Sequence, residues 1–223
     1  MKRLLAHDPD VKVVLPDGTT RPLFSYLLPT TLLMLAALLL LISMFLPYWS
    51  MTMLAPQYPQ GLKVEVYVNH LEGDMREVDQ LNHYLGMPPL DEGGRFERSI
   101  SVTAVVVLGL LLMTGIFVGN QWAGVLAIPA LAYPLIFLAD LWLILYRYGH
   151  SIDPESALGG AIPPFTPPLL GEGVVGQFRT IARPELGLAV TLLATIVILA
   201  ALWFHRAAYK PIVDARRRLA ASG

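Results

Sequence analysis

The sequence predicts an all-α membrane protein, a four-helix transmembrane bundle with two extracytoplasmic loops, the first containing a small strand and helix. Hydrophobic residues make up 55% of the 223 residues and charged residues 15%, so the chain is too apolar for an ordinary soluble domain. Four apolar stretches reach the length of about 20 residues that a helix needs to cross the hydrocarbon core of a bilayer. Longer polar segments separate the first stretch from the second and the third from the fourth.

The first predicted element is a polar N-terminal tail, residues 1–28. A Pro-Asp-Gly segment at 16–18 closely follows the β-branched pair Val13 and Val14, and these residue types favour a strand that enters a tight turn. We therefore expect a small surface hairpin. No secretory signal peptide is predicted, because the first apolar stretch starts late and is longer than the roughly 7–15 residues typical of such signals.

The four predicted spans are residues 29–48, 99–118, 123–146 and 186–204. The first span begins with a proline, which suits the first turn of a helix. It ends at Pro47, Tyr48 and Trp49, a stop followed by two interfacial aromatics. The second and third spans are joined by the short uncharged link 119–122, so they are expected to form an antiparallel helical hairpin. The fourth span leads into a basic tail, residues 205–223.

The distribution of lysine and arginine predicts the orientation of the spans. The tails 1–28 and 205–223 carry nine of the 16 basic residues, whereas the loops 49–98 and 147–185 carry seven over nearly twice the length. Basic segments tend to stay in the cytoplasm, so both termini are predicted to be cytoplasmic and both loops extracytoplasmic. The first loop is also acidic, with eight Asp and Glu residues against four basic ones.

The first loop, 49–98, contains two predicted elements. Residues 62–68 partly alternate polar and apolar side chains and are rich in β-branched residues, which favours a strand. Further on, apolar residues recur at helical spacing, with Asp74 as the expected cap and Gly86, followed by a proline, as the expected stop. The apolar face of this short helix consists of Met75, Val78, Leu81 and Leu85.

The second loop, 147–185, contains a proline-rich segment. Residues 162–170 are apolar but include four prolines, which remove backbone donors and fix φ, so this segment is expected to be extended. The glycines of segment 171–176 follow no predicted strand. We interpret them as turn residues rather than as a dinucleotide-binding motif.

Composition and motifs argue against several classes of function. The 16 basic and 17 acidic residues nearly balance, so no net positive charge favours nucleic acid. The sequence contains no phosphate-binding loop, and we expect no nucleotide cofactor. Haem would need histidines on facing helices inside the bilayer, whereas His150 and His205 lie at opposite ends of predicted spans. We expect no haem and no enzymatic activity.

Any metal site in this chain has to use histidine, methionine or carboxylate ligands, because cysteine is absent. His83 and Met87 lie four residues apart near the end of the predicted helix, and imidazole and thioether donors suit Cu(I). His70, Met51 and Met53 would complete such a copper site if the loop folds back. In the structural alternative, the methionines cover apolar or interfacial surface and His83 hydrogen-bonds within the loop.

Asp140 is the one acidic residue inside a predicted span. An ionisable residue in the membrane indicates either a functional group, such as a proton relay, or a structural ion pair. It lies about six residues from the outer end of the third span, roughly 9 Å of helix, so basic partners are within reach. Both interpretations stay open, and the candidate partners are Arg147, Arg98 and Arg183.

Several short motifs in the two loops are similar to motifs found in a known group of proteins. They are Tyr58, Pro59, Gly61 and Leu62; Gly73 and Asp74; residues 82–87; and Pro164, Phe165, Pro168, Leu170 and Gly171. In these positions the chain resembles uncharacterised multi-pass membrane proteins with an Asn-His-Tyr-x-Gly-Met loop motif, associated with bacterial copper-handling and nitrous-oxide-reductase accessory clusters. The resemblance implies an extracytoplasmic role near copper enzymes, in the bacterial cytoplasmic (inner) membrane, and it supplies no ligand set.

Together, these observations predict an integral membrane accessory protein for copper handling or for the maturation of an extracytoplasmic metalloenzyme. Its expected partners are membrane lipid and the proteins of a membrane complex or a copper enzyme. The alternative is a non-catalytic structural subunit of a respiratory or transport membrane complex, without a metal of its own.

The predicted topology can be tested with single cysteines, since the chain has none of its own. The variants Gln80→Cys, Gly171→Cys and Ala220→Cys are treated in intact cells with a membrane-impermeant thiol reagent. Positions 80 and 171 should react directly and position 220 only after permeabilisation, because the basic tails are expected to stay in the cytoplasm. Labelling of position 220 but not of position 80 in intact cells would overturn this topology.

Overall fold

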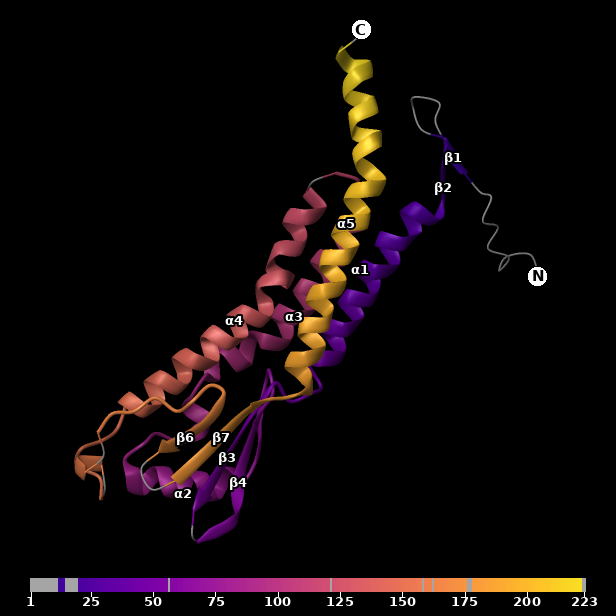
Figure 1. Ribbon diagram of the computed structural model, residues 1–223. Helices are drawn as coiled ribbons and strands as arrows, with labels where there is room; N and C mark the ends of the chain where they lie inside the picture. The colour runs from indigo at the N-terminus through magenta and orange to yellow at the C-terminus, as the bar shows by residue number, and fades with distance from the viewer. Residues whose placement is uncertain are drawn as a thin grey trace. The chain divides into compact units, whose positions relative to one another are not determined.

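The computed structural model describes residues 12–14, 20–55, 57–120, 122–157, 159–161, 163–175 and 178–221 (Figure 1). The chain divides into two compact units. One consists of residues 1–39, 108–131 and 193–223, and the other of residues 40–107 and 132–192. We call the second of these the sheet unit.

Four long helices carry most of the apolar residues. Each is long and apolar enough to cross a membrane, in agreement with the prediction of a multi-pass membrane protein. The helices are α1 Phe24–Ser43, α3 Arg95–Gly115, α4 Trp122–His150 and α5 Leu186–Ala221.

The helix boundaries differ from the predicted spans for physical reasons. α1 begins before the proline that was expected to open it and ends at Ser43, earlier than predicted. It stops there because the next residues pair with a strand: the Tyr48 N–H donates to Val66 O at 2.8 Å. At the other end of the chain, α5 continues past the predicted limit at residue 204 to Ala221.

The prediction of an all-α bundle is wrong, because the two loops together form a five-stranded antiparallel sheet. Its strand order is β5-β4-β3-β7-β6, so the first loop supplies three strands and the second loop two. The strand predicted at 62–68 corresponds to β4 and starts four residues earlier. The strands are β3 Trp49–Ala55, β4 Tyr58–Val66, β5 Leu71–Gly73, β6 Gly171–Val175 and β7 Phe178–Pro184.

The second loop forms strands by pairing with a distant part of the chain. β3, at the centre of the sheet, pairs with β7, and Met51 lies opposite Ala182. The glycine-rich segment that we interpreted as turns is the edge strand β6, where glycine is better tolerated than in a central strand. The proline-rich segment 163–170 contains no helix or strand, as predicted, and residue 162 lies outside the described residues.

The predicted helix of the first loop is confirmed as α2, Met75–Leu85. Gly86 ends it in the left-handed conformation, with a φ of 73°, as expected of a glycine stop. The predicted cap is wrong, since the Asp74 side chain makes no capping bond to the helix. Its Oδ2 instead accepts the backbone N–H of Lys63 in β4 at 2.8 Å. A short 3-10 turn, Leu90–Glu92, follows α2.

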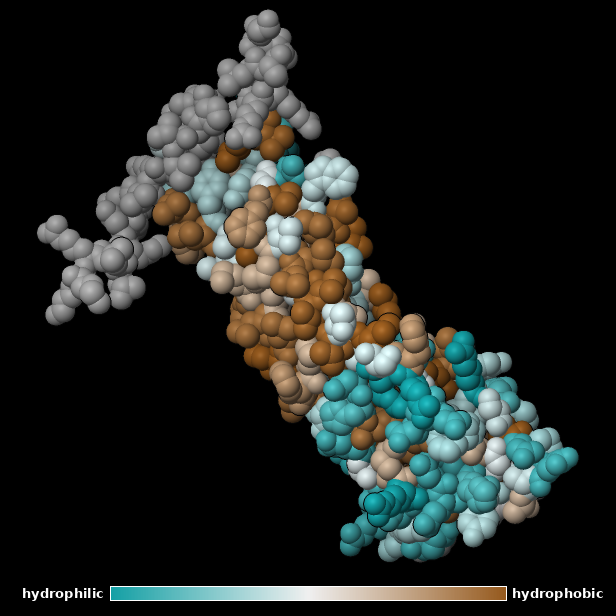
Figure 2. Space-filling model, turned by 180° about the vertical axis from the view of Figure 1, so that it is seen from behind, coloured by the Kyte–Doolittle hydropathy of each residue, from teal (hydrophilic) through white to brown (hydrophobic). Residues whose placement is uncertain are grey.

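Successive side chains of the strands point to opposite faces of the sheet. In β3, Trp49 and Met51 belong to an apolar face, whereas Ser50 lies on a polar face and donates to Glu185 Oε1 at 2.7 Å. In Figure 2, hydrophilic side chains gather over the strands and α2, and hydrophobic ones over the long helices. The apolar face packs against Leu141 and Leu145 of α4 and Val78 of α2.

The other unit contains the N-terminal hairpin and the link between α3 and α4. β1 Lys12–Val14 and β2 Thr20–Pro22 pair antiparallel, which confirms the predicted hairpin. Its turn and most of the N-terminal tail lie outside the described residues. In α5, His205 donates its Nε2–H to Val118 O at 2.9 Å, because a carbonyl oxygen can only accept.

Tyr48 is fully buried and joins three helices within the sheet unit. Its hydroxyl lies 2.7 Å from Ser43 Oγ, 2.9 Å from Thr191 Oγ1 and 3.4 Å from the Tyr133 hydroxyl. Ser43 and Thr191 can each give their single hydrogen to a backbone carbonyl of their own helix. The Tyr48 hydroxyl then donates to one of these two and accepts from Tyr133, so the buried hydroxyls are satisfied.

Gly187, in the first turn of α5, allows this close packing. A Cβ at this position would lie 2.4 Å from Tyr48 Cδ2 and 2.8 Å from the backbone oxygens of Leu46 and Pro47. Its backbone N–H donates to Pro47 O at 2.7 Å. Any side chain here would therefore push α5 away from the segment that contains Tyr48.

We expect Gly187→Ala to lower the stability of the protein by about 1–3 kcal/mol, because an extra methyl group must enter a filled space. The measurement is the midpoint of thermal unfolding in detergent. Gly124→Ala, in α4, is the matched control: nothing lies within 4 Å of its added Cβ, and alanine favours a helix over glycine. The midpoint of Gly124→Ala should equal or exceed that of the unmodified protein. Equal midpoints for Gly187→Ala and Gly124→Ala would contradict the packing argument.

Candidate functional site

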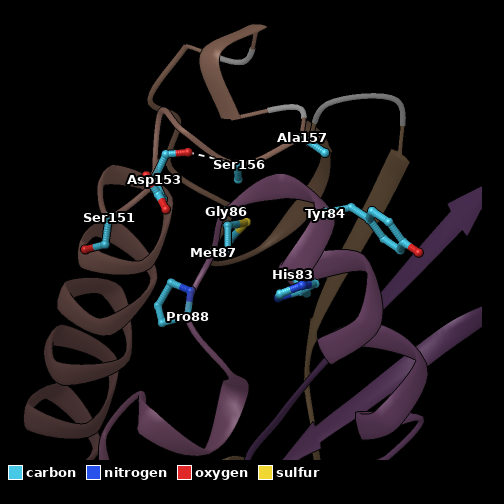
Figure 3. A pocket seen from close by; sticks show the side chains of 9 residues that line it. All are labelled: His83, Tyr84, Gly86, Met87, Pro88, Ser151, Asp153, Ser156 and Ala157. Carbon is cyan, nitrogen blue, oxygen red and sulfur yellow. Dashed lines mark hydrogen bonds between the residues drawn. The ribbon is translucent and has the colours of Figure 1, made fainter.

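A cavity of about 540 Å³ lies in the sheet unit, between the end of α2 and the segment that follows α4 (Figure 3). This volume falls in the range typical of small-ligand sites. The cavity brings together two stretches of chain from different loops. It is lined by His83, Tyr84, Gly86, Met87, Pro88, Ser151, Asp153, Ser156 and Ala157.

Gly86 connects the two walls of the cavity. Its carbonyl oxygen accepts the Asp153 N–H at 2.8 Å, which joins the end of α2 to the segment after α4. A Cβ at Gly86 would lie 2.3 Å from Ser156 Oγ and 2.7 Å from Asp153 O. Glycine is therefore needed here both for the left-handed backbone and for the close approach of the second segment.

Side chains outside the cavity hold the same two elements in place. The Asn82 side chain donates to the Tyr148 hydroxyl at 3.2 Å, and that hydroxyl donates to Pro88 O. Asp79 Oδ1 accepts the Leu90 N–H at 2.8 Å, which fixes the turn after α2. The position of the cavity is thus set by the last turns of α2 and α4.

His83 and Met87, the two residues predicted to share a site, both line this cavity. Figure 3 shows their side chains at the end of α2, with Asp153 and Ser156 on the facing segment and Tyr84 directed away. The His83 ring is exposed and makes no hydrogen bond to any described residue. Met87 is only 9% exposed. The cavity therefore has one exposed imidazole, which lies edge-on to the Tyr84 ring at 6.2 Å, whereas the Met87 thioether is nearly buried.

The other predicted ligands lie elsewhere in the sheet unit. His70 follows β4, where its ring stacks on Tyr67 at 4.3 Å and its Nε2 lies 3.1 Å from Glu72 Oε1. Met51 and Met53 belong to β3 and pack in two apolar clusters of the sheet. None of these three residues lines the cavity.

Asp153 is a cavity residue that the sequence analysis did not select. Its Oδ1 accepts the Glu155 N–H at 2.9 Å, and its Oδ2 makes no hydrogen bond within the described part of the chain. The Asp-Pro-Glu-Ser sequence starting at this position indicates a turn, so the local conformation could have been predicted. Its place opposite His83 depends on the backbone hydrogen bond to Gly86, and no local sequence pattern predicts that contact.

The donor set of the cavity limits the metals that fit it. Among the described residues, no group of three or more His, Cys, Asp or Glu side chains is placed to hold a metal ion. The cavity lining includes the His83 imidazole, the Met87 thioether and the Asp153 carboxylate. Thioether and imidazole donors are in general better suited to copper, whereas hard cations such as Mg²⁺ prefer several oxygen ligands.

Asp140 forms none of the ion pairs considered for it. No basic group lies within 4.0 Å of its carboxylate in the described part of the chain. Arg98, one expected partner, donates to Asp91 O at 2.6 Å instead. The charged groups that act on Asp140 from a longer distance are Glu97 of α3 and Arg147 of α4.

No protein-family model, curated protein or solved structure matches this chain. Its function therefore has to be inferred from the cavity and its surroundings.

Gly86→Ala should loosen the wall formed by segment 151–157, because the new Cβ would collide with Asp153 O and Ser156 Oγ. The measurement is backbone hydrogen exchange, which should become faster in that segment. Gly171→Ala is the matched control, since Gly171 also has a positive φ, of 85°, but no atom within 4 Å of an added Cβ. Unchanged exchange in Gly86→Ala would mean that the two walls are not coupled.

Proposed function

We propose that this protein is an integral membrane accessory protein that binds Cu(I) through His83 and Met87. It would serve copper delivery or the maturation of an extracytoplasmic metalloenzyme, in the bacterial inner membrane with both termini in the cytoplasm. The observation that carries the proposal is the cavity at the end of α2, which is lined by both the His83 imidazole and the Met87 side chain.

The chemistry of the two donors supports a soft, exchangeable metal. Imidazole nitrogen and thioether sulfur bind Cu(I) without a thiolate, and the chain has no cysteine. Two soft donors leave the coordination of the ion incomplete, and the cavity of about 540 Å³ is much larger than one ion. A donor side chain from a receiving protein therefore has room to enter, as copper transfer requires.

Electrostatics around the cavity support a cationic ligand. The first loop carries eight acidic residues against four basic ones, so its field attracts cations. Asp153 adds a carboxylate oxygen with no hydrogen bond of its own among the described residues.

The proposed role is non-catalytic, and both serine hydroxyls of the cavity are engaged with the backbone. Ser151 donates to Arg147 O at 2.7 Å and Ser156 donates to Asp153 O at 2.8 Å. Neither hydroxyl gives its hydrogen to a side-chain base, which a serine nucleophile would require.

A non-catalytic structural subunit of a respiratory or transport complex is the second candidate. The polar face of the sheet favours it, because this face carries the exposed charged residues Lys63, Glu172 and Arg179, whose charges are already paired. Lys63 donates to the Glu65 carboxylate, which raises the pKa of Lys63 above its ordinary value. Arg179 pairs with Glu172 across neighbouring strands. A partner protein could dock on such a surface without a metal.

The copper proposal is tested by anaerobic Cu(I) titration of the full chain in detergent. The double variant His83→Ala, Met87→Leu should lose affinity by about tenfold or more, because both soft donors are removed. Asp153→Asn keeps the oxygen that accepts the Glu155 N–H and removes only the charge. It should therefore weaken copper binding less than the double variant does.

The matched control for this titration is the double variant His70→Ala, Met53→Leu. It removes the same two residue types from the sheet unit at positions that do not line the cavity. Its affinity should equal that of the unmodified protein. If the His83, Met87 variant also binds copper normally, these residues are part of the scaffold and the structural-subunit function takes first place.

A further inference from the structure

The part of α4 that belongs to the sheet unit exposes a continuous stripe of side chains. Leu135 is 69% exposed, Trp142 49% and Tyr146 40%, and these residues recur at helical spacing. On the opposite side, Leu141 and Leu145 are buried against the sheet. The stripe includes Leu135, Ile136, Trp142, Tyr146, Arg147 and His150.

The chemical character of this stripe changes in one direction along the helix. It is aliphatic at Leu135 and Ile136, aromatic at Trp142 and Tyr146, and basic or imidazole-bearing beyond them. A bilayer presents the same order, from hydrocarbon through the interface to phosphate, and tryptophan and tyrosine are enriched at that interface. An interface with another protein would not require such an order.

The aromatic part of the stripe is a stacked ladder. Trp142 and Tyr146 stack with ring centroids 5.6 Å apart, and Tyr146 and His150 stack at 4.1 Å. His150 Nδ1 lies 2.8 Å from Tyr146 O, and because a carbonyl can only accept, Nδ1 carries the hydrogen. The rings are thus held in place while their outer faces remain exposed.

Distances along the helix match the depth of a headgroup layer. Tyr146 lies four residues beyond Trp142 and His150 eight, which is about 6 Å and 12 Å at 1.5 Å per residue. The polar layer of one leaflet is about 5–8 Å thick, and a tilted helix crosses it over a longer path. With Trp142 at the hydrocarbon boundary, Tyr146 and Arg147 reach the level of the phosphates.

We infer that the face of α4 formed by Trp142, Tyr146, Arg147 and His150 binds the headgroups of membrane phospholipids. The aromatic rings lie at the boundary of the hydrocarbon layer, and the Arg147 guanidinium and the Tyr146 hydroxyl donate to lipid phosphate. This inference does not depend on copper binding. It places Ser151 and Asp153, which line the cavity, within a few residues of the membrane surface.

The test uses single cysteines carrying a nitroxide spin label at Leu135, Tyr146 or His150, with the full chain in phospholipid nanodiscs. All three positions are exposed, so the label does not disturb a packed core. Gln80, exposed on α2, is the control for a position in water. The measurement compares the accessibility of each label to oxygen, which concentrates in the bilayer, and to a water-soluble nickel chelate.

The ratio of oxygen to nickel accessibility should be highest at position 135, intermediate at 146 and 150, and several-fold lower at 80. Water-like ratios at both 146 and 150 would show that the stripe faces solvent and would overturn the inference. Low accessibility to both reagents at these positions, with spin–spin broadening between copies, would show that a second copy covers the stripe. That outcome would also overturn it.

Discussion

The hydrogen bonds and packing of Tyr48 connect the sheet to the helices of its unit. Its hydroxyl contacts α1, α4 and α5, while its backbone pairs with Val66 O and the Glu185 N–H. The next residue, Trp49, donates its indole N–H to Leu169 O at 2.6 Å, which attaches the second loop to the first. Because these groups are buried, losing any of them would leave a polar atom without a partner in an apolar surrounding.

Sequence patterns were sufficient where the structure is local. Helical periodicity and a glycine stop identified α2, and hydropathy identified the four long helices. The sheet could not be predicted in the same way, because β3 lies directly after an apolar span, where its methionines are typical of a membrane interface. Its partner β7 is about 130 residues away and is preceded by prolines and glycines, which favour turns.

The candidate site shows the same division between local and distant information. The four-residue spacing of His83 and Met87 predicted a shared site, and both residues line the cavity. Met87 nevertheless lies beyond Gly86, where α2 has already ended, so helical spacing does not determine its position. Asp153 could not be predicted, because its position depends on a backbone hydrogen bond to Gly86 from another loop. The extended geometry of β3 explains why its methionines are absent from the cavity. Both point to the apolar face, where α2 and α4 pack, so they are part of the core.

The pairing of β3 with β7 also determines when this protein can finish folding. A ribosome releases β3, β4 and β5 first, and at that stage one edge of β3 has no partner strand. β7 follows only after α3 and α4 have been synthesised, and such long-range pairing is slow. The sheet is therefore completed late in translation. A nascent chain that stalls before β7 exposes a strand edge on which other chains can aggregate.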